Sequence, residues 1–197
     1  MNEILINLVV EDVLSGTVAQ VMLKSSERPF VVATVRNERG FGAIKKKIQN
    51  FNQAAQWMPY LVITDLDNHP CPVTMVNEWI DTPRHKNLIF RVAVREIEAW
   101  LLADRENIAQ FLQISSAQID RSPETLHDPK AALIQAVKKH SRSRSIRTDI
   151  VPIGATSSIG PNYNGRLSEF TMKHWDVNLA RTNAPSLDRA MRSLEIF

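Results

Sequence analysis

The chain has few of the features that mark secreted or membrane proteins. Its 197 residues include a single cysteine, Cys71, which excludes an intramolecular disulfide. No apolar run reaches the ~18 residues that a membrane-spanning helix needs. The opening segment MNEILINLVVED lacks the basic start of a signal peptide, and an acidic pair stands where a cleavage site should come. We therefore expect a cytoplasmic protein with no membrane partner.

The overall charge is low and does not by itself predict a nucleic-acid-binding protein. The formal net charge is +3, and the 44% hydrophobic and 23% charged residues are typical of a globular domain. The basic residues are clustered, however, most densely in KKHSRSRSIR. This segment supplies candidate contacts to a DNA or RNA backbone: Lys138, Lys139, Arg142, Arg144 and Arg147. A solvated helix face or loop is the alternative interpretation.

Apolar runs alternate with amphipathic segments through the first half of the chain. The expected strands are residues 4–10, 30–35, 60–64 and 87–94, and the expected helices are residues 18–27, 43–56, 73–80 and 95–112, the last in one or two pieces. Thr17 is the expected cap of the first helix. This alternation predicts an α/β fold with a mostly parallel sheet and helices on both of its faces.

After Pro123 the pattern becomes helical. The expected elements are a helix at 128–140, a loop at 141–149, a breaker-rich turn at 154–165, and closing helices at 167–175 and 186–194. We therefore expect a core at residues 1–122 and a helical C-terminal extension at residues 123–197, packed on that core.

Two of the expected strands end in acidic residues. The first runs into Glu11, and the third runs into Asp65 and Asp67, which as residues i and i+2 of a strand should face the same side. Ligands of open parallel sheets bind beyond the carboxyl ends of the strands. Crowded carboxylates need a proton or a cation between them, and Mg²⁺ or Mn²⁺ prefers oxygen ligands. The pattern predicts a divalent-metal site. Surface acids that cap strand ends are the alternative.

Other enzyme classes also use an Asp-x-Asp pair. Haloacid-dehalogenase phosphatases carry it after the first strand, followed two residues later by Thr or Val, whereas here it follows the third strand and position 69 is His. Nucleotide-sugar transferases hold a metal and a diphosphate with Asp-x-Asp after an apolar strand. This second alternative stays open, although the chain is short for such an enzyme.

The strand ends LINLVVED and YLVITDLD resemble the Toprim fold, the catalytic domain of topoisomerases, primases and OLD-family nucleases. The stretches FRVAVREIEAWLLAD, PETLHDPK and GPNYNGRL extend the likeness to an uncharacterised bacterial Toprim-like family. Its members often lie beside ATPase genes and are similar to the nuclease half of OLD-type anti-phage systems. The resemblance implies a nuclease that works with a separate ATPase, since this chain has no ATP-binding P-loop.

The resemblance also assigns roles to further residues. It favours Glu98 as a catalytic residue, while Glu96 is expected to face solvent in the first turn of its helix. Lys130 would contact a phosphate or stabilise charge in the transition state, and a surface lysine is the alternative. The family has Gly directly after the first Glu, whereas this chain has Asp12. Asp12 either adds a metal ligand or marks a degenerate site.

Two functions follow from these patterns. The leading expectation is a phosphoryl-transfer enzyme, a nuclease dependent on Mg²⁺ or Mn²⁺, that acts on nucleic-acid phosphodiesters. Glu11, Asp65 and Asp67 would hold the metal, and the basic segment would contact the backbone without reading sequence. The alternative is a catalytically weak Toprim-like binding or regulatory subunit of an ATPase, which Asp12 favours. Either function is compatible with an oligomer.

Overall fold

The computed structural model describes residues 2–154 and 157–197, which divide into two compact units. The first unit comprises Met1–Val94 together with Asp188–Phe197, and the second comprises Arg95–Leu187. The expected boundary between residues 122 and 123 falls inside the second unit. Within the described residues, no helix is both long and apolar enough to cross a membrane.

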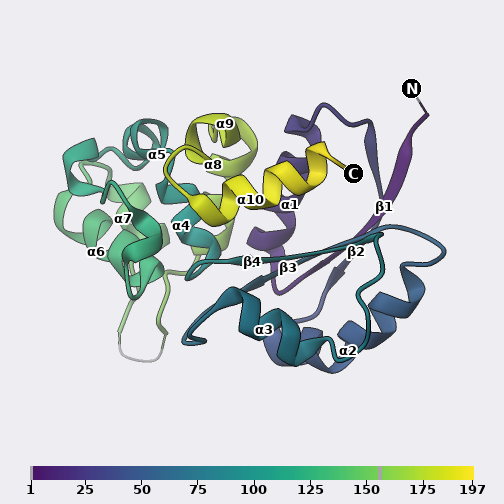
Figure 1. The fold of residues 1–197 in the computed structure, drawn as a ribbon. Helices are drawn as coiled ribbons and strands as arrows, with labels where there is room; N and C mark the ends of the chain where they lie inside the picture. The colour runs from purple at the N-terminus through teal and green to yellow at the C-terminus, as the bar shows by residue number, and fades with distance from the viewer. Residues whose placement is uncertain (1, 155–156) are drawn as a thin grey trace. The chain divides into compact units, whose positions relative to one another are not determined.

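The first unit is built on a parallel sheet. Its strands are β1 (Ile4–Val10), β2 (Phe30–Asn37), β3 (Tyr60–Asp65) and β4 (Leu88–Ala93). Their order is β2-β1-β3-β4, and every pairing among these described strands is parallel (Figure 1). This confirms the α/β fold class and the predicted parallel pairing of the first and third strands. Because β2 lies on one side of β1 and β3 on the other, the connections change direction between β1 and β3.

Helices cover both faces of this sheet (Figure 1). They are α1 (Val13–Ser25) and the Asp188–Glu195 part of α10 (Pro185–Glu195) on one face, and α2 (Phe41–Ala54) and α3 (Pro72–Trp79) on the other. In α2 the buried residues Ile44, Ile48 and Phe51 recur at helical spacing and share one core cluster with Val62 and Phe90 of the sheet. Burial of this apolar stripe fixes α2 against the sheet.

The first helix begins earlier than the sequence predicts. Asp12 is its N-cap: the Asp12 Oδ1 atom accepts hydrogen bonds from the backbone N–H and the hydroxyl of Ser15, both at 2.8 Å. Thr17, the predicted cap, lies inside α1, where its hydroxyl donates to the carbonyl of Val13 at 2.9 Å. The prediction of Thr17 as the cap is wrong, because Asp12 offers a capping oxygen earlier in the chain and the helix begins directly after it.

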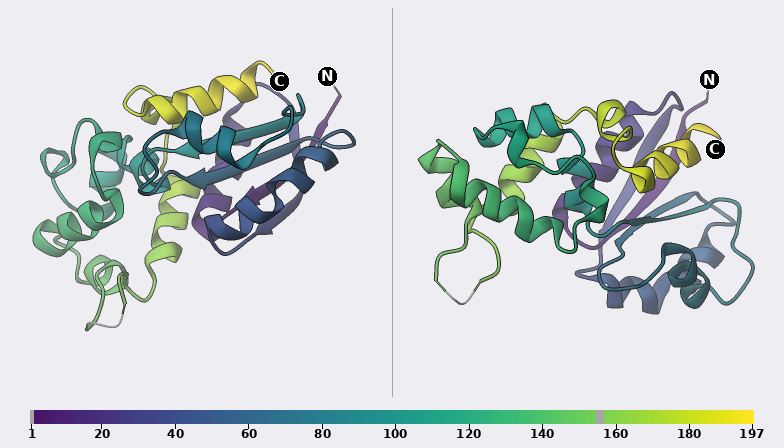
Figure 2. Two further views of the ribbon diagram at one scale, coloured as in Figure 1. Left: turned by 60° about the horizontal axis from the view of Figure 1, so that its bottom comes forward. Right: turned by 60° about the vertical axis from the view of Figure 1, so that its left-hand side comes forward.

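The second unit forms helices and no strand in its described residues (Figure 2). They are α4 (Ile97–Leu102), α5 (Arg105–Leu112), α6 (Pro129–His140), α7 (Arg144–Ile150), α8 (Tyr163–Lys173) and α9 (Val177–Ala180), with 3₁₀ turns η1 (Ser116–Gln118) and η2 (Pro123–Thr125). The predicted helical C-terminal region is thereby confirmed. Trp100 is fully buried in this unit, where its indole N–H donates to the Ser186 hydroxyl at 2.7 Å.

Two local predictions for this unit need correction. Residues 141–149 were expected to form a loop, but they contain most of α7, whose N-cap Ser143 accepts a hydrogen bond from the backbone N–H of Ile146 at 3.2 Å. Ile146 and Ile150 are buried one turn apart, which explains why the helix forms. Of the breaker-rich turn expected at 154–165, residues 155 and 156 lie outside the described residues, and the end of the segment already belongs to α8.

Candidate functional site

Glu11 and Asp65 lie at the carboxyl ends of neighbouring parallel strands. Glu11 directly follows β1, and Asp65 is the last residue of β3. The connections change direction between these two strands, and at such a switch point an open parallel sheet leaves a crevice for ligands. The sheet order therefore places two of the predicted site residues where a ligand site is expected.

The Glu11 carboxylate is held by β3. Its Oε1 atom accepts hydrogen bonds from the hydroxyl of the buried Thr64 and from the backbone N–H of Asp65, the latter at 2.8 Å. Its Oε2 atom makes no hydrogen bond within the described residues. Glu11 thus has one oxygen that fixes its position and a second oxygen that is available to a ligand.

The surroundings of Glu11 disfavour its charged form. Burial raises the pKa of its carboxyl, and the negative charges of Asp67 and Asp12 raise this pKa further. The hydrogen bonds from Thr64 and Asp65 act in the opposite direction, but the net shift is upward. The structure thus brings Asp12, Asp65 and Asp67 close to Glu11, and the resulting crowding of acids would be relieved by a bound cation.

Asp67 reaches this cluster from a turn and not from a strand. Because β3 ends at Asp65, the strand alternation used to place Asp65 and Asp67 on one side does not apply. Asp67 has a φ of 49°, in the left-handed region that few residues other than glycine adopt, and the turn is closed by a hydrogen bond from His69 N–H to the Leu66 carbonyl at 2.9 Å. Aspartate is one of the residues that tolerate this conformation, so the turn accounts for the φ of Asp67.

The carboxylates do not form a preassembled protein cage for a metal. Among residues 2–154 and 157–197, no group of three or more His, Cys, Asp or Glu side chains is arranged to hold an ion. One oxygen of Asp12 is already committed to capping α1. The donors that remain suit a hard cation such as Mg²⁺, which is commonly held by one or two carboxylates and completes its shell with water and phosphate.

Glu98, predicted as catalytic, lies in the second unit at the start of α4. Its side chain is 2% exposed, and its Oε1 atom accepts a hydrogen bond from the Tyr163 hydroxyl at 3.0 Å. The Lys130 ammonium, also a predicted site group, lies 3.5 Å from the same oxygen. The Glu98 Oε2 atom is buried without a hydrogen-bond partner. Burial is the main reason why the pKa of Glu98 rises to about 7, against the attraction of Lys130.

Glu96 does not face solvent as expected. Its side chain is 16% exposed, and it accepts hydrogen bonds from the backbone N–H of Lys130 at 3.0 Å and from the Lys130 ammonium at 3.3 Å. It precedes α4 and therefore binds the first turn of α6 instead of projecting from its own helix. Its negative charge further raises the pKa of Glu98. Lys130 thus joins two glutamates that are two positions apart.

Residues 11–159 match the family DUF4276, a domain of unknown function. The chain belongs to this family. The DUF4276 match begins at Glu11 and includes Asp65, Glu98 and Lys130, whereas Tyr163 lies beyond it. No curated protein and no solved structure matches the chain. The match supplies no link to Toprim domains or OLD nucleases, so that likeness stays a prediction.

The predicted nucleic-acid contacts of the DUF4276 chain cluster around the end of α6 and the start of α7. Lys138, Lys139, Arg142 and Arg144 are exposed. Arg147 differs, because its guanidinium donates to the backbone carbonyl of Ser141 and so ties α7 to the segment that precedes it. The exposed members can contact a phosphate backbone, while Arg147 has a local structural role.

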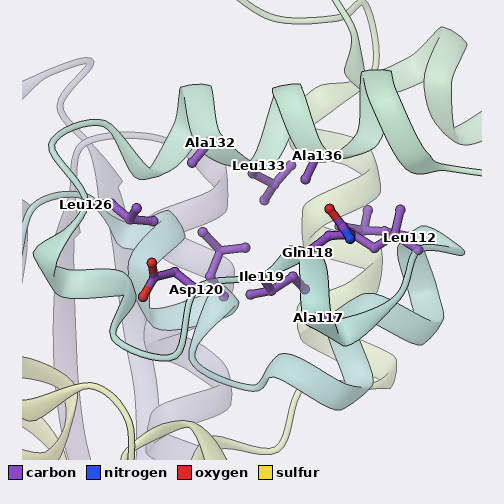
Figure 3. Close-up of a pocket in the computed structure, with 11 residues that line it drawn as sticks. Leu112, Ala117, Gln118, Ile119, Asp120, Leu126, Ala132, Leu133 and Ala136 are labelled. Carbon is purple, nitrogen blue, oxygen red and sulfur yellow. The ribbon is translucent and has the colours of Figure 1, made fainter.

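The second unit also contains a pocket of about 320 Å³, lined mainly by apolar residues, that no sequence motif indicates (Figure 3). It lies between α6 and the segment around η1. The side chains that line it are Leu102, Leu112, Ile114, Ala117, Gln118, Ile119, Asp120, Leu126, Ala132, Leu133 and Ala136. The Asp120 carboxylate accepts a hydrogen bond from the backbone N–H of Ser122 at 2.7 Å.

Sequence reasoning missed one residue of the Glu11 site, Thr64, because nothing in the sequence pattern distinguishes a hydroxyl that binds a site carboxylate from an ordinary strand threonine.

Proposed function

We propose that this DUF4276 chain is a Toprim-like, metal-dependent phosphoryl-transfer enzyme, a nuclease acting on DNA or RNA phosphodiesters. The observation that carries the proposal is the hydrogen bond between Glu11 and the backbone of Asp65 at the switch point of a parallel sheet. Glu11 follows β1 and the Asp-x-Asp pair follows β3, which supports the Toprim likeness inferred from the same residues.

Glu11, Asp65 and Asp67 would hold Mg²⁺ or Mn²⁺. A bound metal would neutralise charge on the phosphate and act as a Lewis acid toward its oxygens. Within the chain, Thr64 and the Asp65 N–H hold Glu11 in one orientation, so the carboxylate does not need to reorganise when substrate arrives.

Glu98 and Lys130 are proposed to contribute proton transfer and a positive charge. A carboxyl with a pKa of about 7 can hold or release a proton near neutral pH, which is one requirement of a general acid or base. The other requirement is contact with the substrate, and the Glu98 side chain, 2% exposed, would make it only after a rearrangement of the second unit. The Lys130 ammonium beside Glu98 would stabilise negative charge on a phosphate.

The test is a cleavage assay on single- and double-stranded DNA and RNA, with Mg²⁺, with Mn²⁺ and with EDTA. We expect cleavage only with metal, and its loss in Asp65→Asn, which keeps the size of the side chain but removes its charge. The melting temperature in EDTA should change little. Glu3→Gln is the matched control, because it removes an exposed carboxylate at the opposite end of β1. Cleavage at the wild-type rate in Asp65→Asn would exclude Asp65 as a required ligand.

Two observations favour the second candidate, a catalytically weak binding or regulatory subunit of a separate ATPase, over a nuclease that acts as an anti-phage defence effector with such an ATPase. The described residues contain no preassembled group of three metal ligands, and Asp12 serves as a helix cap. The deciding experiment adds a purified partner ATPase to the same assay. If the wild-type chain cleaves no nucleic acid in either metal, alone or with that ATPase, the binding-subunit function replaces the nuclease.

A further inference from the structure

Three arginines of the first unit gather at the β4 edge of the sheet. Arg91 comes from β4 itself, Arg84 from the segment that precedes this strand, and Arg189 from α10. The Asp188–Glu195 part of α10 lies over one face of the sheet (Figure 1), and the hydrogen bond between Arg91 and Ser193 places it against β4. Segments that are far apart in the chain therefore contribute to one basic cluster, which is separate from the Glu11 site.

Arg91 lies partly inside the protein. Its strand neighbours Phe90 and Val92 point into the core cluster shared with α2 and α3, so Arg91 points to the opposite face, which α10 covers. There its Nε–H donates to the Ser193 hydroxyl at 2.7 Å. The two terminal nitrogens of its guanidinium make no hydrogen bond within the described residues. Two directed cationic donor groups are therefore available to a ligand.

The described residues show no direct ion pair to this cluster. In the described part of the chain, no carboxylate forms an ion pair with Arg84, Arg91 or Arg189. Burial, and then the positive charges of Arg84 and Arg189, lower the pKa of Arg91 to about 10. Arg91 is still protonated at neutral pH, so three positive charges lie close together.

Arg84 and Arg189 are exposed and could be ordinary solvated arginines of the surface. Arg91 is only partly exposed, so this explanation does not suit it. A half-buried guanidinium with two unbonded nitrogens and two cationic neighbours is instead placed to gain from a bound anion. Arginine is suited to that anion, because its planar fork presents paired N–H donors to the oxygens of a phosphate.

We propose that Arg84, Arg91 and Arg189 form an oxyanion site that binds a phosphate group at the β4 edge. The group can come from free phosphate or from a nucleic-acid backbone, and the chemistry of recognition is the same for both. The site involves none of the predicted metal ligands, so it stands independently of the proposed nuclease activity.

The test is the melting temperature of the full chain in EDTA, with inorganic phosphate titrated against chloride at equal ionic strength. Ligand that binds the folded state raises the melting temperature. We expect phosphate to stabilise the wild type more than chloride does. Arg189→Gln and Arg84→Gln should each weaken apparent phosphate affinity about tenfold or more, as expected for a lost charge-assisted contact. Without phosphate, Arg189→Gln should melt no lower than the wild type, because one repelling charge is gone.

The control is Lys24→Gln, which removes an exposed positive charge from α1 of the same unit and should respond to phosphate as the wild type does. Asp65→Asn should also keep the response, which separates this site from the nuclease proposal. A single-stranded oligonucleotide without terminal phosphates identifies the source. If the oligonucleotide displaces phosphate from the wild type but not from Arg189→Gln, the site binds a nucleic-acid backbone. If phosphate binds and the oligonucleotide does not displace it, the site binds free phosphate. The proposal is overturned if phosphate acts no more strongly than chloride, or if Lys24→Gln loses as much response as Arg189→Gln.

Discussion

The Glu11 carboxylate accepts a hydrogen bond from the backbone N–H of Asp65 at 2.8 Å, although the two residues are 54 positions apart in the chain. The donor is a backbone N–H, so Asp65→Asn, which changes only the side chain, leaves this bond between the ends of β1 and β3 in place. The Thr64 hydroxyl, which shares the same Glu11 oxygen, can be removed. It therefore gives experimental access to the charge state of Glu11.

Thr64→Val should raise the pKa of Glu11 further, because the Thr64 hydrogen bond lowers that pKa in the wild type. If metal binding needs the Glu11 carboxylate, the acid limb of the pH–rate profile of cleavage should move to higher pH, and the free energy of unfolding should fall by about 1 kcal/mol. Thr64→Ser keeps the hydroxyl and should keep the wild-type profile. If the Val and Ser variants gave the same pH–rate profile, the Thr64 hydrogen bond would not set the pKa of Glu11.

Glu98 predicts how stability depends on pH. Its pKa is about 7 in the folded chain against an ordinary value of 4.5, so the folded state holds the proton longer than the unfolded state. The contribution of Glu98 to the free energy of unfolding is fully present below pH 4.5. It is lost progressively as the pH rises to about 7. The loss is on the order of 3 kcal/mol, since each unit of pKa difference corresponds to about 1.4 kcal/mol.

Glu98→Gln should abolish this part of the pH dependence. Gln keeps a hydrogen-bond acceptor for Tyr163 and carries no charge, so the variant should melt higher than the wild type at pH 8 and about equally at pH 4.5. The measurement is a series of thermal melts between these pH values. Glu106→Gln, an exposed glutamate of α5, is the control and should follow the wild type. A Glu98→Gln curve parallel to the wild type would contradict the assignment.

Gly160 predicts a steric requirement in the GPNYNG segment. A Cβ atom at this position would lie 2.3 Å from the Asp149 carbonyl oxygen and 2.4 Å from the carbonyl carbon of Ile150. Gly160→Ala should therefore destabilise the chain by about 1–3 kcal/mol, the usual effect of overpacking. Gly42→Ala in α2 meets nothing within 4 Å and should be neutral or slightly stabilising. Chemical denaturation of both variants checks the pair, and equal effects would contradict the steric argument.

The sheet was predictable because its signals are local. Each strand is an apolar run, and β1 and β3 lack polar alternation, which is typical of parallel strands buried on both faces. The acids that end these strands could be assigned to one edge for the same reason. The short helix α7 was not predictable by periodicity, because its seven residues include only Ile146 and Ile150 as buried positions.

The features that the sequence did not predict depend mostly on contacts between distant parts of the chain. Glu96 was expected to face solvent, but it accepts a hydrogen bond from the backbone N–H of Lys130, 34 positions later in the chain. Arg91 meets Ser193 across 102 positions, and a lone arginine in an apolar strand gives no signal of that partner. Asp12 shows a different limit, since its short polar side chain suits both a metal ligand and a helix cap, and only the geometry of α1 shows that it serves as the cap.

The exposed basic cluster predicts a salt-dependent affinity for nucleic acid. Arg144 is exposed on α7, whereas the Arg147 guanidinium is bonded to the Ser141 carbonyl. If the cluster contacts phosphates, Arg144→Gln should weaken binding of a short duplex and reduce the slope of log affinity against log salt by about 1, with little change in melting temperature. Arg147→Gln should instead lower the melting temperature and leave the slope nearly unchanged. Titrations at several salt concentrations separate the two effects, and an unchanged slope in Arg144→Gln would identify the cluster as a solvated surface.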